Sequence, residues 1–449
     1  MAKILLIAPP FYRLLGSHYN GLHLGIAYIA AVLKEHGHFV KIYNADYGET
    51  TQYANQRQLF ENYPSYKAIL DDPANAIWGE IKDNISSFAP DLIGITMLTA
   101  NYKAAKIIAR IAKSINSNIK IVIGGVHPTL DPEGTLAEEE FDYVIRGEGE
   151  FTFLELADNQ REEEIKGLSF KKSGQMIHNE DRPFIDDLDA LPYPCRDSFL
   201  NDTRYLDLGH LITGRGCPFS CAYCASPRLW QRTVRFRSIS NVISELEYLQ
   251  TNYNASIIHF ADDTFTLNKH RAKEICRQII DRRLEIEWVC DTRADCLDRE
   301  LVALMKSAGC VRIKIGVESG SDRILKRMKK GETKEKIRQA VSLIKGEGLP
   351  FTAYFMAGFP GETNEDLKQT IELARELDAD YYSLGIVAPY YGTEIWNDLE
   401  KSGNKPDKEH WDYFYHQSPE MLLNDDLDPV LIGQFWALNE TPLGEKRRV

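Results

Sequence analysis

Short apolar runs alternate with stretches of helical periodicity along the first third of the chain. Five runs predict strands, over residues 3–8, 39–43, 91–96, 120–124 and 143–145. The clearest helical stretches between them cover 24–36 and 101–115. Apolar strands that alternate with helices are typical of a parallel sheet covered on both faces. Residues 1–155 are therefore predicted to form a doubly wound, Rossmann-like α/β domain.

A second alternation of strands and helices starts near residue 205. Its candidate strands cover 210–213, 256–260, 285–290, 312–316, 351–355 and 382–386. Helical segments lie between them, over 239–252, 268–283, 298–308, 334–347 and 363–377. This series predicts a partial (β/α)6 barrel over 205–395, because a closed barrel of this kind needs two more units.

The segments outside the two alternations are expected to connect and cover them. Residues 156–204 are charged and rich in turns, which predicts a linker with a small hairpin at 167–178. Residues 396–449 show no alternation and are expected to form a C-terminal cap on the barrel.

Bulk composition restricts the class of protein without identifying it. Of the 449 residues, 43% are hydrophobic and 27% charged, as in an ordinary globular protein. A net charge of −13 argues against general binding to nucleic acid, which needs a positive surface. No run approaches the roughly 18 apolar residues of a membrane span, and the first apolar stretch is too short for a signal peptide. A cytoplasmic location is expected, where the eight cysteines are thiols or metal ligands.

Three cysteines follow the first barrel strand at the spacing CxxxCxxC: Cys217, Cys221 and Cys224. A tight loop of this kind can place three thiolates around an iron–sulfur cubane and leave one iron open to substrate or cofactor. The alternative is a structural zinc site, which needs four ligands in closed geometry, and the only nearby spare cysteine is Cys195. The iron–sulfur cluster is therefore favoured.

Four further cysteines lie within predicted helices and strands or beside them, without tight spacing. They are Cys276, Cys290, Cys296 and Cys310. Buried thiols are favoured there over an auxiliary cluster.

A CxxxCxxC loop after the first strand of a six-unit (β/α) series resembles the radical SAM superfamily. In that superfamily a [4Fe–4S] cluster binds S-adenosylmethionine (SAM) at its unique iron and cleaves it reductively. The resemblance covers about residues 205–395. It implies that Cys217, Cys221 and Cys224 hold the cluster.

The resemblance also implies where the remaining groups of SAM bind. Tyr223 would pack near the adenine, and Asp262 and Asp263, after the second strand, suit the methionyl amine. Arg293, after the third strand, could pair with the SAM carboxylate, and Glu318, at the end of the fourth, could accept the ribose hydroxyls. The implied set is completed by Phe219, Gly358 and Pro389. Each motif alone also fits an ordinary turn or helix cap. The occurrence of all of them at matching strand ends favours SAM binding.

A doubly wound domain before such a barrel resembles the cobalamin-binding class of the same superfamily. The resemblance assigns cobalamin contacts to the glycine-bearing stretch 21–27 and to residues after three strands: Gly25, Thr96, Leu98, Thr99, Gly124, Gly125, Val126, His127, Gly147 and Glu148. A Gly-Gly pair after a strand also lets a ligand approach the backbone closely, and the crevice outside the strand ends is the usual ligand site.

Cobalamin is expected to bind without a histidine ligand from the protein. None of the eleven histidines follows the pattern Asp-x-His-x-x-Gly, which proteins that ligate cobalt through histidine carry. The loop 96–102 is expected to lie against the lower face of the corrin. His127 is expected to contact the nucleotide tail rather than a metal.

Four arginines gather after the cysteines in this otherwise acidic chain: Arg228, Arg232, Arg235 and Arg237, with Trp230 among them. They could steer an anionic substrate or pair with the phosphate and carboxylate groups of cofactors. A solvated face that pairs with the acidic stretch 138–164 is an equal alternative.

The resemblance implies a reaction in which a 5′-deoxyadenosyl radical activates an unactivated carbon and methylcobalamin methylates it. A rearrangement, cyclisation or oxidation with the same cofactors is the alternative, and a non-catalytic metal-binding sensor is a further one. Expected partners are an external electron donor of flavodoxin or ferredoxin type and a small-molecule, tetrapyrrole, lipid or peptide substrate. No stretch of the sequence separates these substrates, and no nucleic-acid partner is expected.

Overall fold

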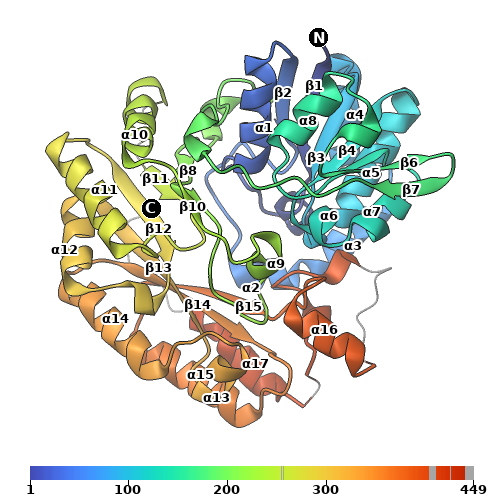
Figure 1. Ribbon diagram of the computed structural model, residues 1–449. Helices are drawn as coiled ribbons and strands as arrows, with labels where there is room; N and C mark the ends of the chain where they lie inside the picture. Colours follow the sequence, from blue (N-terminus) through green and yellow to red (C-terminus); the bar gives the residue numbers. More distant parts are fainter. Residues whose placement is uncertain (254, 256, 404–410, 425, 440–449) are drawn as a thin grey trace. The chain divides into compact units, whose positions relative to one another are not determined.

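The computed structural model describes residues 1–253, 255, 257–403, 411–424 and 426–439. The chain divides into two compact units (Figure 1). Unit 1 comprises Met1–Leu208, Tyr390–Gly392 and Trp396–Tyr415, and unit 2 comprises the rest of the described chain. No described helix is long and apolar enough to cross a membrane.

Unit 1 is built on a seven-stranded sheet. The strands are β1 (Lys3–Ala8), β2 (Phe39–Asn44), β3 (Leu92–Thr96), β4 (Lys120–Gly124), β5 (Tyr143–Ile145), β6 (Leu168–Lys172) and β7 (Gln175–His178). Their order is β2-β1-β3-β4-β5-β6-β7, and β1 to β5 are parallel. The five predicted strands are therefore present. The order reverses between β1 and β3, and such a switch point is where ligands bind sheets of this kind.

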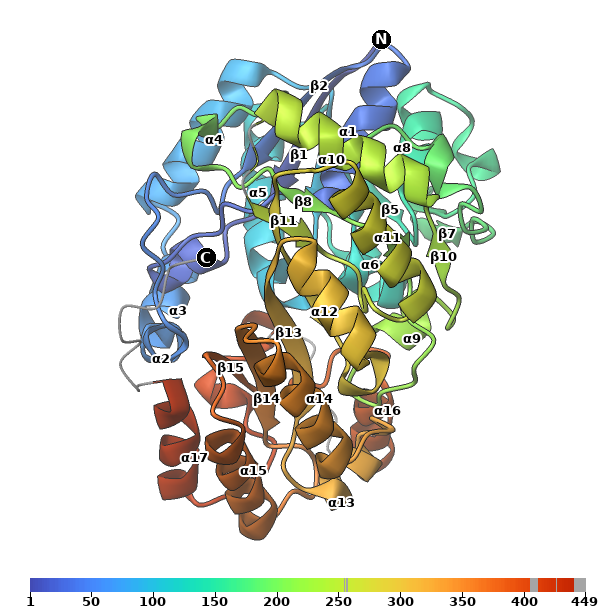
Figure 2. The same ribbon diagram turned by 90° about the vertical axis from the view of Figure 1, so that its left-hand side faces the viewer.

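Helices cover both faces of this sheet (Figure 2). On one face α1 (Leu24–Glu35) packs against α8 (Glu150–Ala157), and on the other α4 (Ala76–Phe88) packs against α5 (Tyr102–Ile115). In α5 the buried residues Ala104, Ala105, Ile108, Ala109 and Ala112 recur at helical spacing and form one apolar face. The shorter helices are α2 (Gln56–Glu61), α3 (Tyr63–Asp71), α6 (Val126–Leu130) and α7 (Pro132–Ala137).

The stretch 156–204, expected as a linker, is partly built into this unit. The predicted hairpin forms as β6 and β7, and β6 pairs antiparallel with β5. Leu168 and Phe170, both in β6, are buried. Further along, the backbone of Ile42 in β2 bonds to Ser198 and Leu200, each at 2.8 Å, so this stretch also follows the opposite edge of the sheet.

Unit 2 contains a six-stranded parallel sheet. Its strands are β8 (His210–Leu211), β11 (Ile257–Phe260), β12 (Glu287–Thr292), β13 (Cys310–Glu318), β14 (Phe351–Ala357) and β15 (Tyr381–Ile386), in sequential order across the sheet. The helices between them are α10 (Ile239–Tyr253), α11 (Lys269–Asp281), α12 (Arg299–Ser307), α13 (Asp322–Arg327), α14 (Lys334–Gly346) and α15 (Asn364–Leu377). The predicted partial (β/α)6 barrel is confirmed.

The two faces of β13 differ in polarity. Ile313, Ile315 and Val317 are buried, and they alternate with the half-buried Arg312 and Lys314. Since successive side chains point to opposite faces of a strand, the apolar set packs under the helices and the polar set faces the other way.

The expected C-terminal cap is divided between the units. The stretch that contains α16 (Glu394–Lys401) ends in a short 3-10 helix, Trp411–Tyr413, and from Trp396 onward it groups with unit 1. The described residues of 416–439 pack on the barrel: Ile386 in β15 donates to the His416 carbonyl at 2.7 Å, and α17 (Pro429–Trp436) packs on α15. Residues 404–410, 425 and 440–449, which the expected cap includes, lie outside the described residues.

Candidate cluster and cofactor site

The three motif cysteines lie in a loop between β9 (Gly214–Arg215) and α9 (Ser226–Leu229), and each is half-buried. β9 pairs antiparallel with β10 (Arg235–Phe236), so the two ends of the segment that carries the cysteines lie side by side. Arg232 donates from Nε to the Pro218 carbonyl at 3.0 Å and braces the loop from the returning segment. The sequence spacing thus becomes one closed loop that carries all three thiols.

The three sulfur atoms are not gathered as closely as the ligands of a single zinc ion would be. Cysteine sulfurs at about 2.3 Å from one tetrahedral zinc would lie about 3.8 Å apart. Among the described residues, the three Sγ atoms of Cys217, Cys221 and Cys224 do not form a set within 4.8 Å of one another. A cubane is larger, and its cysteine ligands are correspondingly further apart.

Two donors point at these sulfur atoms. The Ser226 backbone N–H donates to Cys224 Sγ at 3.4 Å, and Arg293 Nη1 donates to Cys221 Sγ at 3.9 Å. Burial raises the pKa of Cys224 to about 12, and it raises the pKa of Cys217 as well. Without a metal these two thiols keep their protons, so cluster assembly must release protons.

The paired aspartates after β11 have different surroundings. Asp262 is buried, and its carboxylate accepts the backbone N–H of Thr213 at 2.9 Å and the Thr213 hydroxyl at 2.7 Å. Arg271 donates to the same threonine hydroxyl at 2.9 Å. Asp263 is exposed and accepts the Ser226 hydroxyl at 3.1 Å. Asp262 therefore anchors the start of the cysteine loop, and of the two only Asp263 presents an accessible carboxylate for an amine.

Glu318 ends β13 in a left-handed conformation (φ +68°), where the register with β14 shifts. The ammonium of Lys330 holds its carboxylate at 3.0 Å and lies 3.5 Å from Glu332. Tyr223 bonds to Glu318, and burial, followed by this carboxylate, raises the Tyr223 pKa well above its usual value. Tyr223 and Glu318, the residues predicted for adenine and ribose, are thus in direct contact, and Lys330, which the sequence did not single out, holds the Glu318 carboxylate.

Arg293 meets a carboxylate from its own chain where one from SAM was expected. Its Nε and Nη2 bond to the two Asp295 oxygens, each at 3.0 Å. Its guanidinium also stacks on Phe219, another predicted SAM contact, 3.7 Å from the ring centroid. The bidentate fork expected for SAM is therefore already filled, because Asp295 lies two residues away on the same 3-10 turn.

The last two predicted SAM residues lie after β14 and β15. Gly358 has φ +83°, and its N–H donates to Glu362 at 2.6 Å. Burial raises the pKa of Glu362 to about 7. Pro389 is buried at the end of the segment that follows β15. These positions stay predictions, since their contacts are with the chain itself.

In unit 1, the loops after β3 and β4 meet at the ends of the strands. Gly125 has φ +114°, and a Cβ there would lie 2.7 Å from the Met97 carbonyl oxygen, so only glycine allows this packing. Leu98, in the loop after β3, is 52% exposed, which is unusual for a large apolar residue. Thr96 lies at the end of β3, next to Gly125.

His127 is turned inward. Its Nδ1 bonds to the Thr99 hydroxyl at 2.9 Å, and the Tyr102 and Trp411 rings pack edge-on against it. Only 1% of the residue is exposed. The expected contact with a nucleotide tail is therefore not open to this side chain. Its surroundings agree with the prediction that it is not a metal ligand.

The remaining predicted cobalamin residues divide between open and internal positions. Gly25 and Gly147 have open space where a Cβ would point, and Gly124 and Val126 are half-buried beside Gly125. Glu148 is internal, because its carboxylate accepts the Ile185 N–H at 2.8 Å. Glu148 therefore fixes the chain after β7 and does not present its carboxylate to a ligand.

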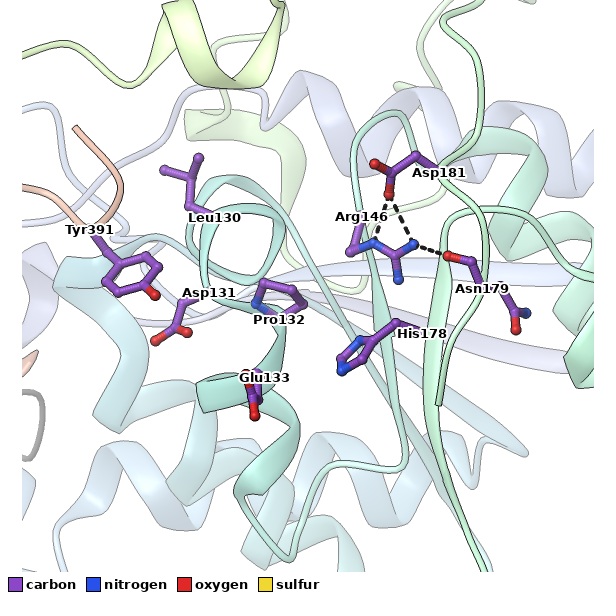
Figure 3. A pocket seen from close by; sticks show the side chains of 9 residues that line it. All are labelled: Leu130, Asp131, Pro132, Glu133, Arg146, His178, Asn179, Asp181 and Tyr391. Atoms are coloured by element: carbon purple, nitrogen blue, oxygen red, sulfur yellow. Dashed lines mark hydrogen bonds and ion pairs between the residues drawn. The ribbon is translucent and has the colours of Figure 1, made fainter. Parts of the chain in front are cut away.

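A cavity of about 420 Å³ lies beside the Gly147 loop. Figure 3 shows Arg146 on its wall, bonded to Asp181 at 3.0 Å and to the Asn179 carbonyl. Its third nitrogen donates to the Leu168 carbonyl at 3.2 Å. The cation is engaged with the chain on every side, and the other polar groups on the wall include Asp131, Glu133 and His178.

The arginine patch does not form one solvated face. Arg237 is buried and pairs with the buried Glu245 at 2.5 Å, and Arg232 braces the cysteine loop. Arg235 lies over the Trp230 ring at 5.7 Å. Arg232 and Arg237 therefore bind other parts of the chain.

The auxiliary cysteines are core thiols. Cys276, Cys290 and Cys310 are buried on α11, β12 and β13, and burial raises the pKa of each. Cys296 is buried too and lies 3.6 Å from an Asp295 oxygen. These surroundings agree with the prediction of buried thiols.

Gly216 gives a first test of the cysteine loop. It has φ +103°, and an added Cβ would meet the Thr233 carbonyl oxygen at 2.0 Å. Gly216→Ala is expected to cost about 1–3 kcal/mol in strain and to lower the iron bound per chain. Gly37→Ala is the matched control, because Gly37 has φ +84° with nothing within 4 Å. Iron analysis and thermal unfolding measure both; equal iron in the Gly216 variant and the wild type would contradict the expectation.

The comparisons with known proteins agree with the geometry of both units. The family model of the Radical SAM superfamily matches residues 211–374, and that of the B12 binding domain matches residues 17–157. A protein of Pyrococcus horikoshii named as a methyltransferase is 37% identical over 407 residues, covering 88% of this chain and 82% of the relative. The chain belongs to the cobalamin-binding radical SAM enzymes, whose cofactors are a [4Fe–4S] cluster, SAM and cobalamin.

More distant relatives differ in the reactions that their names state. An anaerobic magnesium-protoporphyrin IX monomethyl ester cyclase of Rubrivivax gelatinosus is 29% identical, over 71% of this chain and 60% of the relative. A cytidylyl-2-hydroxyethylphosphonate methyltransferase of Streptomyces wedmorensis is 25% identical, over 85% and 78% respectively.

Among solved structures, the radical SAM methyltransferase TsrM of Kitasatospora setae, with cobalamin and a [4Fe–4S] cluster bound, shares the fold. Its TM-score is 0.72 at 17% identity, over 98% of this chain and 89% of that one. The cobalamin-dependent enzyme OxsB has a TM-score of 0.65 at 22% identity, over 95% of this chain and 58% of that one.

Proposed function

We propose that the chain is a cobalamin-dependent radical SAM methyltransferase that acts on an unactivated carbon of a small molecule. One observation carries the proposal: a loop with three half-buried cysteines after the first barrel strand and a sheet that matches the B12 binding domain occur in one chain. Two relatives named as methyltransferases, 37% and 25% identical, support methylation as the reaction.

The bound cofactors supply electron transfer, SAM cleavage and the carried methyl group, and the chain supplies their positions. Cys217, Cys221 and Cys224 would hold the cluster. Asp263 would accept the methionyl amine, since its carboxylate is exposed beside this loop. Glu318, oriented by Lys330, would accept the ribose hydroxyls.

The strand ends of unit 1 would hold cobalamin through shape and apolar contact. Leu98 offers an exposed apolar side chain, and the glycine at 125 keeps the two loops closely packed. The one histidine on these loops, His127, bonds to Thr99 inside the unit. This arrangement supports cobalamin binding without a histidine ligand from the protein.

The proposal includes a substrate class, an electron donor and a cellular location. The substrate would be a small molecule, with tetrapyrroles included, since the relative from Rubrivivax gelatinosus is named for the cyclisation of a magnesium-protoporphyrin. A flavodoxin- or ferredoxin-type protein would deliver the electron. The net charge of −13 disfavours nucleic acid. We place the protein in the cytoplasm because none of the eight cysteines, all of them described in the structure, forms a disulfide.

The test is an anaerobic assay of the reconstituted protein with SAM that carries a trideuteromethyl group. Candidate small molecules are added, and products are identified by mass. The label is expected in a product, together with 5′-deoxyadenosine. 5′-Deoxyadenosine without label in any converted product would indicate a rearrangement or cyclisation instead, and neither product would overturn the enzymatic proposal. A Cys224→Ala variant serves as the blank.

A further inference from the structure

Arg293 is held rigidly at the cysteine loop by contacts on several sides. It follows β12 directly and is 5% exposed. Besides its two bonds to Asp295, Nη2 donates to the Lys330 carbonyl at 2.7 Å. Nη1 donates to Cys221 Sγ at 3.9 Å. The guanidinium therefore has one nitrogen directed at a cysteine of the motif, and its other two are held by partners on the barrel.

Stacking fixes the plane of this guanidinium relative to the loop. The Phe219 ring lies 3.7 Å from its centre, and Phe219 is itself in the loop, between Cys217 and Cys221. Two anions balance the charge: Asp295 bonds to Nε and Nη2, each at 3.0 Å, and Glu332 forms an ion pair with Nη2 at 3.8 Å. These contacts leave Nη1 as the nitrogen whose N–H is directed at the Cys221 sulfur.

We propose that Arg293 is a positioning residue for the cluster, which acts through Cys221: its N–H donates to the thiolate sulfur and raises the reduction potential. This inference rests on the proposed function. A reduced cluster carries one more negative charge, shared with its sulfurs, so a donor at a ligand sulfur stabilises the reduced state more than the oxidised one. The residue thereby favours electron uptake from a weak donor. It does not bind the SAM carboxylate, because its fork is filled.

The experiment is a potentiometric titration of the reconstituted holoprotein without SAM, followed by electron paramagnetic resonance of the reduced cluster. Arg293→Gln is expected to lower the ratio of reduced to oxidised cluster about tenfold at the potential that half-reduces the wild type, as for loss of a hydrogen bond to a charged group. Asp295→Asn is expected to shift the ratio upward, because it removes the nearest compensating anion. Collapse of the loop would not produce shifts of opposite sign.

Arg277→Gln is the matched control, because Arg277 also pairs with a carboxylate in the barrel, Glu300 at 3.0 Å, but at the surface. Its ratio is expected to equal that of the wild type. An unchanged ratio of reduced to oxidised cluster in Arg293→Gln, with full iron content, overturns the inference. It does so whether or not SAM binding is weakened. If the Gln variant does not assemble a cluster, Asp295→Asn decides alone, and an unchanged ratio there overturns the inference. Failure of the wild type to assemble a cluster would instead refute the proposed function.

Discussion

Replacing Cys217, Cys221 or Cys224 with alanine is expected to abolish both the cluster and SAM cleavage. Each sulfur would hold one iron, and the loop between β9 and α9 offers no substitute thiol. The iron content should fall from about four per chain to near zero, since a cubane does not persist on two protein ligands. Iron and sulfide analysis after anaerobic reconstitution measures the first effect, and 5′-deoxyadenosine formation under reducing conditions measures the second.

The control is a cysteine from the barrel core. Cys310→Ala removes a thiol that is buried on β13, with its sulfur 3.6 Å from the Arg312 carbonyl. It is expected to keep its iron and its SAM cleavage. Retained cleavage in any motif variant would refute the cluster assignment. Loss of iron in the Cys310 variant would revive an auxiliary cluster in the core.

The fold could be predicted from the sequence where one short run of residues decides the structure. The parallel strands were predictable because most of them contain a short apolar run, and the longer helices of the barrel follow 3.6-residue periodicity. The helix α4 was not selected, although Trp78, Ile81, Ile85 and Phe88 recur at helical spacing. The hairpin β6–β7 was expected, but its pairing with β5 depends on residues more than twenty positions earlier.

The candidate site, like the fold, was predictable only where residues close in sequence decide the structure. All three motif cysteines lie within eight residues, so their loop can be predicted from spacing alone. The partners of the other site residues come from distant segments. The Thr213 hydroxyl donates to the carboxylate of Asp262, which lies 49 positions later. Lys330, which follows α13, forms an ion pair with Glu318, which precedes that helix. No local pattern states which of two adjacent aspartates turns inward, because packing between elements decides it.

Lys330 carries the largest expected effect on stability. Its ammonium is 4% exposed and is the cation nearest to the carboxylate of Glu318, at 3.0 Å. It also lies 3.5 Å from the fully buried side chain of Glu332. Lys330→Met would leave both carboxylates in a dry site with less compensation, and removing one partner of a buried pair costs about 3–5 kcal/mol. Urea denaturation at pH 8 should show this loss.

The loss should shrink as the pH falls. Burial raises the pKa of Glu332, and Lys330 is the largest influence that lowers it. Without Lys330 the pKa of Glu332 rises further above its value in the unfolded chain. A group with a raised folded pKa binds its proton more tightly when folded, so the variant gains stability as pH falls through that pKa and loses it as pH rises. Measurements at pH 8 and pH 5.5 should therefore differ more for the variant than for the wild type.

Two further variants make this interpretation specific. Lys329→Met changes the preceding residue, whose ammonium is 52% exposed and pairs with Glu394 at the surface, so it should cost only about 0–1 kcal/mol. The double variant Lys330→Met with Glu332→Gln removes the buried carboxylate together with its partner. It should recover part of the stability at pH 8 and lose most of the added pH dependence. A double variant no more stable at pH 8 than Lys330→Met alone would show that lost packing, not an uncompensated charge, causes the destabilisation.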